Sequence, residues 1–109
     1  MLLPCGVDLT IVTMAFEARE QPAAGALADV LAKYVVVSRG HPGCRNIDLC
    51  ASVTTPGRFV VIEKWESGAA QRAHFDSADM VDMANACRPL VAGAPVVELL
   101  DGVSAHDLA

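Results

Sequence analysis

Hydrophobic and polar positions follow the two-residue period of a strand and the longer period of a helix in turn along this chain. Residues 7–19 alternate and are rich in β-branched and aromatic side chains, which predicts a first strand. Apolar residues at helical spacing follow, with Pro22 suited to the first turn and Gly40 ending the helix. The apolar face of this helix is expected to carry Leu27, Val30, Leu31, Tyr34 and Val35.

The next two segments predict a β-hairpin. Residues 45–53 and 58–65 each alternate between their two faces, and a Thr-Pro-Gly turn joins them directly. One face of the first strand is expected to carry Ile47, Leu49, Ala51 and Val53. One face of the second strand is expected to carry Phe59, Val61, Glu63 and Trp65.

The rest of the chain is expected to contain two helices and a last strand. Ser67 suits the N-cap of a helix over residues 68–75. A second helix is predicted over residues 78–91, and Pro89 is expected to end or bend it early. Residues 95–100 predict the last strand. The buried stripe of the second helix is expected to consist of Met80, Ala84, Cys87 and Val91.

This order, βαββαβ, is typical of an α+β ferredoxin-like fold. Right-handed crossovers place both helices on one face of an antiparallel sheet. The other face is apolar as well, since it carries Val60 and Ile62. One helix layer leaves that face uncovered, so we expect two copies to join sheet to sheet as a dimeric α/β barrel. This homodimer is expected to bury Glu63 and Glu98 near the interface or a cavity.

Composition indicates one domain and argues against several classes of partner. The 109 residues suffice for a single core, expected over residues 8–100, with a polar tail over residues 101–109. Hydrophobic residues make up 53% and mean hydropathy is +0.39, yet no apolar run approaches the ~18 residues of a membrane span. The net charge of −5, with scattered basic residues, argues against binding to nucleic acid or to an anionic membrane.

Cysteines and the first residues predict a cytoplasmic protein. The start of the sequence lacks the basic region and long apolar core of a signal peptide. Its four cysteines match no small disulfide framework. His41 and Cys44 have a spacing that a metal ion uses, but a zinc site needs about four ligands, so we expect a turn and no metal. No nucleotide-binding motif is present, and no cofactor is expected.

The candidate chemistry lies where the third strand breaks into the following helix. Trp65, Glu63 and His74 come close together there. A histidine can accept a phenolic proton near neutral pH, but a partly exposed, solvated helix histidine is an equal alternative for this position. Glu63 is expected to orient His74, to stay protonated in a cavity, or to pair with Arg72 or Arg58.

Three motifs resemble the antibiotic biosynthesis monooxygenase domain family. They are SRGHPGC at residues 38–44, TTPGRFVVIEKWES at residues 54–67 and AAQRAHFDS at residues 69–77. The resemblance covers about residues 9–100 and implies a dimeric ferredoxin-like α/β barrel. Members of this family include cofactor-free oxygenases of anthrones and quinols, an isomerase of a signalling-molecule phosphate and haem-degrading enzymes. The resemblance therefore implies the fold more strongly than the reaction.

The resemblance also assigns individual residues. Trp65 matches the tryptophan that lines the pocket of the anthrone oxygenases, and His74 matches a helix histidine of quinol- and signal-processing members. Val61 and Gln71 stand where the anthrone oxygenases have asparagine and tyrosine, which argues against an anthrone substrate. The haem-degrading branch does not fit, because the residues near its haem-contacting positions here are methionine and alanine.

Together these features predict a small monooxygenase that oxidises a quinol or a polyketide-type phenol with molecular oxygen. His74 is the expected base, and Glu63 is the carboxylate expected to orient it. The expected pocket walls are Trp65, Phe59, Val61, Phe16 and Met14. The alternatives are an isomerase of a small signalling metabolite and a non-catalytic dimeric ligand-binding barrel. An open pocket that reaches the histidine favours an enzyme or a binder, whereas a filled core favours a structural role.

Overall fold

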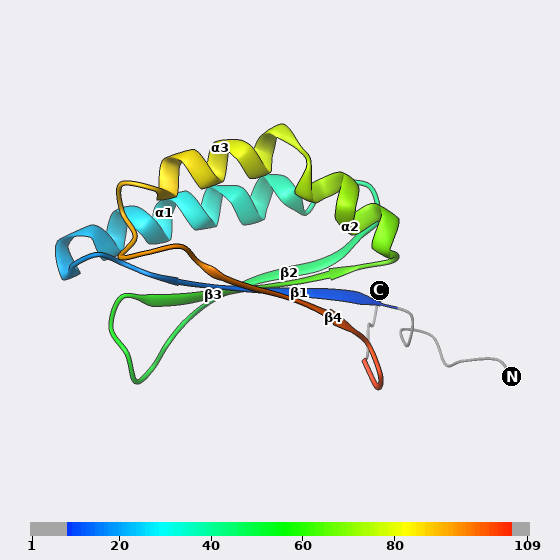
Figure 1. The fold of residues 1–109 in the computed structure, drawn as a ribbon, viewed down its shortest axis with the longest axis horizontal. Coiled ribbons are helices and arrows are strands. Elements are labelled where there is room, and N and C mark those ends of the chain that lie inside the picture. The colour runs from blue at the N-terminus through cyan, green and yellow to red at the C-terminus, as the bar shows by residue number, and fades with distance from the viewer. Residues whose placement is uncertain (1–8, 106–109) are drawn as a thin grey trace, which may run out of the picture.

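The computed structural model describes residues 9–105, in which a four-stranded antiparallel sheet carries its helices on one face (Figure 1). This arrangement confirms the predicted α+β ferredoxin-like fold. Two consecutive helices follow the third strand, so the order is βαββααβ rather than βαββαβ. The elements are β1 (Thr10–Glu17), α1 (Gln21–Ser38), β2 (Cys44–Ala51), β3 (Arg58–Trp65), α2 (Gly68–Phe75), α3 (Ala78–Cys87) and β4 (Val96–Asp101).

The register of β1 and β3 sets out the rows of side chains beneath the helices. The strand order is β2-β3-β1-β4. Met14 lies opposite Val61, and Val12 lies opposite Glu63 in the next row on the same face. All four side chains are buried. Such rows repeat every two residues, about 7 Å along a strand. Glu63 therefore lies one row of side chains away from the Met14–Val61 pair on the same face of the sheet.

Local signals fix where the helices begin. Pro22 lies in the first turn of α1, where its missing N–H has no helical partner to lose. The hydroxyl groups of Ser67 and Ser77 accept hydrogen bonds from the backbone N–H groups of Ala70 and Met80, at 3.1 and 3.3 Å. These caps confirm the predicted starts of α2 and α3. Within residues 9–105 no helix has both the length and the apolar character needed to cross a bilayer.

The ends of β2 and α3 differ from the prediction. β2 ends at Ala51, so Val53 lies in the following turn and is fully exposed. α3 ends at Cys87, four residues earlier than the predicted limit. Pro89 explains this end, because its ring and its missing N–H prevent the helix from continuing.

The buried stripe of α3 was predicted wrongly in part. Met83 and Cys87 are buried, whereas Ala84 is exposed and Met80 is partly exposed. α3 packs beside α1, which turns Met83 toward the core. Met80 and Ala84 instead face an open pocket. Val91 lies beyond the helix, in an isolated bridge to Ala18, the residue after β1.

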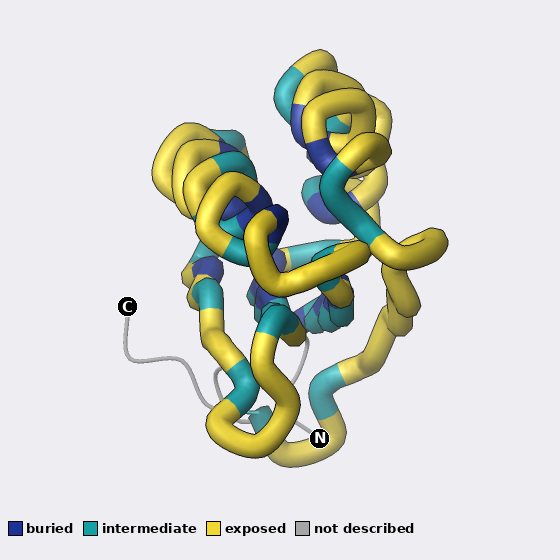
Figure 2. The backbone as a smooth tube through the Cα atoms, turned by 90° about the vertical axis from the view of Figure 1, so that its left-hand side faces the viewer, coloured by how far each residue is buried: buried dark blue, intermediate teal, exposed yellow. Residues whose placement is uncertain are grey.

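The helices cover one face of the sheet, and buried residues gather between the two layers (Figure 2). The opposite face carries Val60, Ile62 and Leu100 with no covering layer of the described chain. Glu98 lies on this bare face, whereas Glu63 lies under the helices. Only Glu98 is therefore placed where a sheet-to-sheet dimer would bury it.

Candidate functional site

A glycine holds the loop after α1 against α2. Gly43 has a φ of 81°, a left-handed conformation that glycine adopts readily. A Cβ atom at this position would clash with the Cβ atom of Ala70 in α2. This close approach places His41, two residues earlier in the loop, beside His74 in α2. The His-Pro-Gly-Cys segment is thus a turn, as predicted, and it also positions a histidine.

Four buried side chains meet where the last turn of α2 faces α1 and β3. The Tyr34 hydroxyl oxygen lies 2.5 Å from Oε2 of Glu63 and 2.7 Å from Nε2 of His74. Glu63 and His74 are 4.0 Å apart, so Tyr34 bridges them. Trp65 donates its indole N–H to Oε1 of Glu63 at 2.9 Å, and its ring stacks on His74 with centroids 4.5 Å apart. Each of these side chains belongs to a residue no more than 4% exposed.

Two further side chains extend this arrangement toward the surface. Nδ1 of His74 lies 3.0 Å from Nδ1 of His41. Nε2 of His41 lies 2.7 Å from Oδ2 of Asp79 in the first turn of α3. The side chains of His41 and Asp79 are 21% and 38% exposed. Hydrogen bonds therefore connect a buried carboxyl group to a partly exposed one. These hydrogen-bonded side chains form a polar cluster of five residues: Glu63, Tyr34, His74, His41 and Asp79.

Burial sets the protonation states at the inner end of the polar cluster. Burial, followed by the charge of His41, lowers the pKa of His74 to about 4. Burial raises the pKa of the Glu63 carboxyl group, although hydrogen bonds from Tyr34 and Trp65 oppose this rise. Burial and the charge of Glu63 raise the pKa of the Tyr34 hydroxyl. At neutral pH, His74 is therefore an uncharged imidazole that can accept a proton at one nitrogen and donate one from the other.

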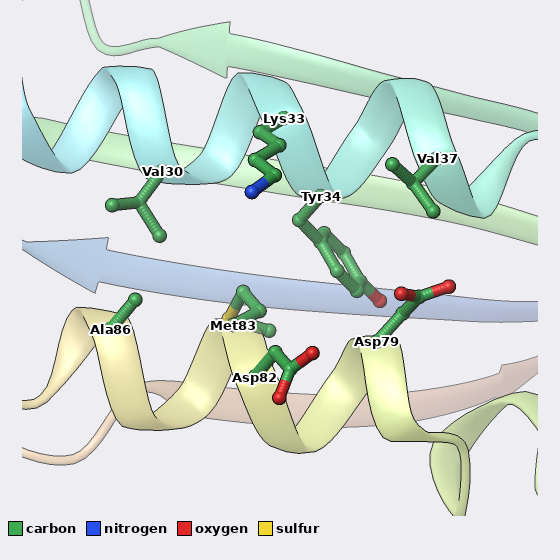
Figure 3. Close-up of a pocket in the computed structure, with 8 residues that line it drawn as sticks. All are labelled: Val30, Lys33, Tyr34, Val37, Asp79, Asp82, Met83 and Ala86. Carbon is green, nitrogen blue, oxygen red and sulfur yellow. The ribbon is translucent and has the colours of Figure 1, made fainter.

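A groove adjoins the polar cluster, and an apolar pocket lies beside that groove. The groove, about 280 Å³, lies between α1 and α3, and the Tyr34 side chain points across it toward Asp79 (Figure 3). The pocket, about 490 Å³, lies between the sheet and α3. This volume is within the ~300–1,000 Å³ of small-molecule sites. Met83 lines both cavities. Other side chains that line the pocket include Met14, Phe16, Met80, Cys87 and Val97.

The residues predicted as pocket walls fall into two groups. Met14 and Phe16 line the apolar pocket. Phe59, Val61 and Trp65 share the helix-covered face of the sheet but lie outside the lining of this pocket. The pocket is open, yet its described lining does not include the predicted base. None of the five residues of the polar cluster lines this pocket.

His74 is buried, which corrects the expectation of a partly exposed position. α2 is eight residues long, and its buried residues are Gln71 and His74. These residues are three positions apart and so lie on one helix face. Phe75, the next residue, is 49% exposed. The helix therefore directs polar groups inward, against the usual pattern of a helix that covers a core.

The partners of Glu63 also differ from one of the expected alternatives. Glu63 hydrogen-bonds to Tyr34 and Trp65, whereas Arg58 and Arg72 are exposed residues. The carboxyl group faces His74 through the Tyr34 hydroxyl rather than directly. Within residues 9–105, no group of three or more His, Cys, Asp or Glu side chains is arranged to hold a metal ion.

Sequence reasoning missed Tyr34, His41 and Asp79 as members of the site. Helical spacing treats Tyr34 simply as a core residue, but the hydroxyl group of a buried tyrosine usually has a partner. That requirement is the one signal that could have found it. His41 and Asp79 are 38 residues apart, and each is separated from its partners by other elements. No local pattern indicates that they meet.

The sequence profile of the antibiotic biosynthesis monooxygenase family matches residues 10–86, more than half of the chain. This region includes the whole polar cluster and the first three strands. Among curated protein sequences, none gives a significant match.

Solved structures give the same picture of the fold. A Caulobacter crescentus protein, provisionally named an antibiotic biosynthesis monooxygenase, is 29% identical, with a TM-score of 0.79 over 89% of this chain and 92% of its own. A Deinococcus radiodurans protein with the same provisional name is 19% identical, with a TM-score of 0.83 over 92% and 98%. Another from Nitrosomonas europaea is 17% identical, with a TM-score of 0.82 over 94% and 97%. The last two similarities bear on the fold alone.

Proposed function

Because the chain belongs to the antibiotic biosynthesis monooxygenase family, we propose that it is a cofactor-independent monooxygenase of an electron-rich phenol or quinol. One observation carries this proposal. An apolar pocket lined by Met14 lies one row of side chains along the sheet from the buried Glu63–Tyr34–His74 cluster. A phenol needs an apolar surface for its ring and a proton acceptor for its hydroxyl group, and the site offers both.

The reaction requires proton movement in both directions. A phenolate transfers an electron to molecular oxygen far more readily than the neutral phenol does, so the first step is removal of a proton. The substrate supplies the electrons, one oxygen atom enters the product, and the other leaves as water. The protein therefore takes up a proton from the substrate and returns protons to the departing oxygen. A water-excluding pocket protects the reactive anion meanwhile.

The geometry supports roles for several residues. The substrate ring occupies the pocket against Met14 and Phe16, with its hydroxyl group directed past Met83 toward the polar cluster. Tyr34 lines the groove with Met83 and hydrogen-bonds to His74, so the uncharged imidazole of His74 accepts the proton through the Tyr34 hydroxyl. Glu63 acts on His74 through the Tyr34 hydroxyl. Met83 lines both cavities, and the flexible side chain of a methionine suits a movable wall between them.

Partly filling the pocket is expected to weaken substrate binding. Ala84 is an exposed residue of α3 that lines the pocket, and Ala84→Leu extends a branched side chain into it. We expect KM for the best phenol or quinol to rise about tenfold, equivalent to ~1.4 kcal/mol of binding. Oxygen uptake across a panel of quinols and phenols measures this effect.

Ala73→Leu is the matched control, because Ala73 is also exposed on a helix but lies outside the pocket lining. It should leave KM unchanged. Equal KM values for Ala84→Leu and Ala73→Leu would show that the substrate does not bind in this pocket. A wild-type protein that consumes no oxygen with any phenol or quinol would contradict the proposed function itself.

The proposed enzyme is a homodimer. The bare face of the sheet carries apolar Val60, Ile62 and Leu100, and a second copy of this face covers them. Stable interfaces between identical chains commonly bury more than about 2,000 Å² in total. This pairing leaves the helix-covered pocket of each copy intact, because the pocket lies on the opposite face of the sheet.

A charge on the bare face is expected to separate the two copies. Ile62→Lys places an ammonium group there, where pairing would desolvate it. Light scattering should give twice the 11.4 kDa chain mass for wild type and a monomer for this variant. Val36→Lys, on the exposed side of α1, is the control and should remain a dimer. A monomeric wild type at micromolar concentration would contradict this arrangement.

A further inference from the structure

The polar cluster has hydrogen-bonding groups that can be satisfied in two ways with the same number of protons. In the first arrangement Glu63 is ionised, and the Tyr34 hydroxyl donates to it. The Nε2–H group of His74 then donates to the Tyr34 oxygen. Its bare Nδ1 accepts from Nδ1–H of His41, whose Nε2–H donates to Asp79. In this arrangement His41 carries both ring protons and is a cation.

In the second arrangement each of three shared protons has moved by one bond. The proton of His41 Nδ1 is now on His74 Nδ1, and the proton of His74 Nε2 is on the Tyr34 oxygen. The original Tyr34 proton is on Oε2 of Glu63, which is now a neutral acid. His41 is neutral and still donates Nε2–H to Asp79. Four protons are present before and after, every hydrogen bond is kept, and one unit of charge has crossed the cluster.

We propose that the polar cluster is a proton relay that connects Asp79 and His41 at the protein surface to the buried carboxyl group of Glu63. The distances between successive heteroatoms are 2.7, 3.0, 2.7 and 2.5 Å, each within hydrogen-bond range. This inference deepens the proposed function, because an oxygenase must export the substrate proton and return protons to the departing oxygen.

Solvent exposure decreases along the relay from Asp79 to Glu63, as a connection between the surface and the core requires. The Asp79 side chain is 38% exposed and the His41 side chain 21%, whereas His74 and Glu63 are at most 3% exposed as residues. Asp79 also lines the groove between α1 and α3, together with Lys33 and Asp82 (Figure 3). Asp79 is therefore the solvent end of the relay. Trp65 holds the inner end by donating to the second oxygen of Glu63.

A substitution at the surface should therefore change the proton positions in the core, and this test needs no enzyme activity. Asp79→Asn removes the negative charge that stabilises the cationic His41, so the second arrangement is favoured. We expect the ring-nitrogen NMR shifts of His74 to report a proton on Nδ1 instead of Nε2. The infrared spectrum should show an increased C=O stretch of a protonated carboxyl group, which Glu63→Gln in the same background removes.

Asp82→Asn is the matched control, because Asp82 lines the same groove but makes no hydrogen bond of the relay. It should leave both spectra unchanged. If Asp79→Asn also leaves the His74 nitrogen shifts and the carboxyl band unchanged, the relay is disproved, whatever the protein catalyses. If Asp79→Asn changes these spectra and the wild-type protein shows no oxygenase activity, the relay is supported and only the proposed function fails.

A second test uses turnover. His41→Ala removes the outer imidazole without altering the pocket, whose lining does not include His41. We expect kcat to fall about tenfold or more with little change in KM, and added imidazole to restore it by occupying the vacated site. An unchanged kcat in His41→Ala would contradict the relay. Asp82→Asn should show neither the loss nor a response to imidazole.

Discussion

Replacing His74 with glutamine is expected to lower the rate of oxygen uptake by about 10²–10⁴-fold, the usual contribution of a positioned acid–base group. The glutamine amide preserves polar contacts in the position next to Tyr34 and His41, but it cannot take up and release a proton. Alanine is a poorer choice at this buried position, because it would leave both partners without a hydrogen bond. Initial rates across the quinol and phenol panel measure the effect.

Arg72→Gln is the control for this substitution. Arg72 is an exposed residue of the same helix. The control therefore introduces the same glutamine side chain at a solvent-exposed position instead of a buried one. Its rate should match that of wild type. Circular dichroism of His74→Gln should show the wild-type spectrum, which separates loss of chemistry from loss of fold. A His74→Gln enzyme with the wild-type rate would show that another group accepts the proton, and Glu63 would then be the candidate.

The second large effect is expected in the acid stability of the protein. His74 has a pKa of about 4 in the folded protein, against 6.5 as its ordinary value. Between these pH values the unfolded chain binds the proton and the folded protein does not, so the free energy of unfolding decreases as pH falls. A difference of about 2.5 pKa units corresponds to about 3 kcal/mol. Denaturant titrations between pH 7 and pH 4 measure this loss.

The comparison of wild type with His74→Gln isolates the contribution of His74 to the pH dependence, because the carboxyl groups of the chain titrate in both proteins. The variant should lose about 3 kcal/mol less than wild type over that range. Glu63 has the opposite effect on the free energy of unfolding, because burial raises the pKa of its carboxyl group. Its stabilising contribution is present at low pH and is lost as pH rises through the raised pKa. One fixed protein concentration is needed if the protein is dimeric. Identical pH dependence in both proteins would contradict the buried, neutral state of His74.

Much of the fold could be predicted because its signals are local. β3 has the predicted bounds, since an alternating segment is bounded by a Pro-Gly turn on one side and by the N-cap Ser67 on the other. The turn at Gly43 and the end of α3 before Pro89 follow from single residues in the same way. Met80 and Ala84 were misplaced because the face that α3 buries depends on its packing beside α1, which no local pattern records.

Only those residues of the candidate site whose face is set by strand alternation could be placed from the sequence. Glu63 and Trp65 share a face of β3, and both were placed there from the sequence. Their partners come from other elements: Tyr34 is 29 residues from Glu63 and 40 from His74. His41 reaches His74 only because a glycine lets the loop approach α2. Such contacts are products of tertiary packing, so the polar cluster becomes visible only in the folded chain.

Turnover under ¹⁸O₂ with the best substrate of the panel tests the central claim most directly. A monooxygenase reaction should consume one oxygen molecule per product, place one ¹⁸O atom in the product and release the other as labelled water. The rate should remain unchanged when the protein has been treated with a metal chelator and supplied with no cofactor. Product that forms without ¹⁸O and without oxygen uptake would contradict the account and would indicate proton-transfer chemistry such as isomerisation.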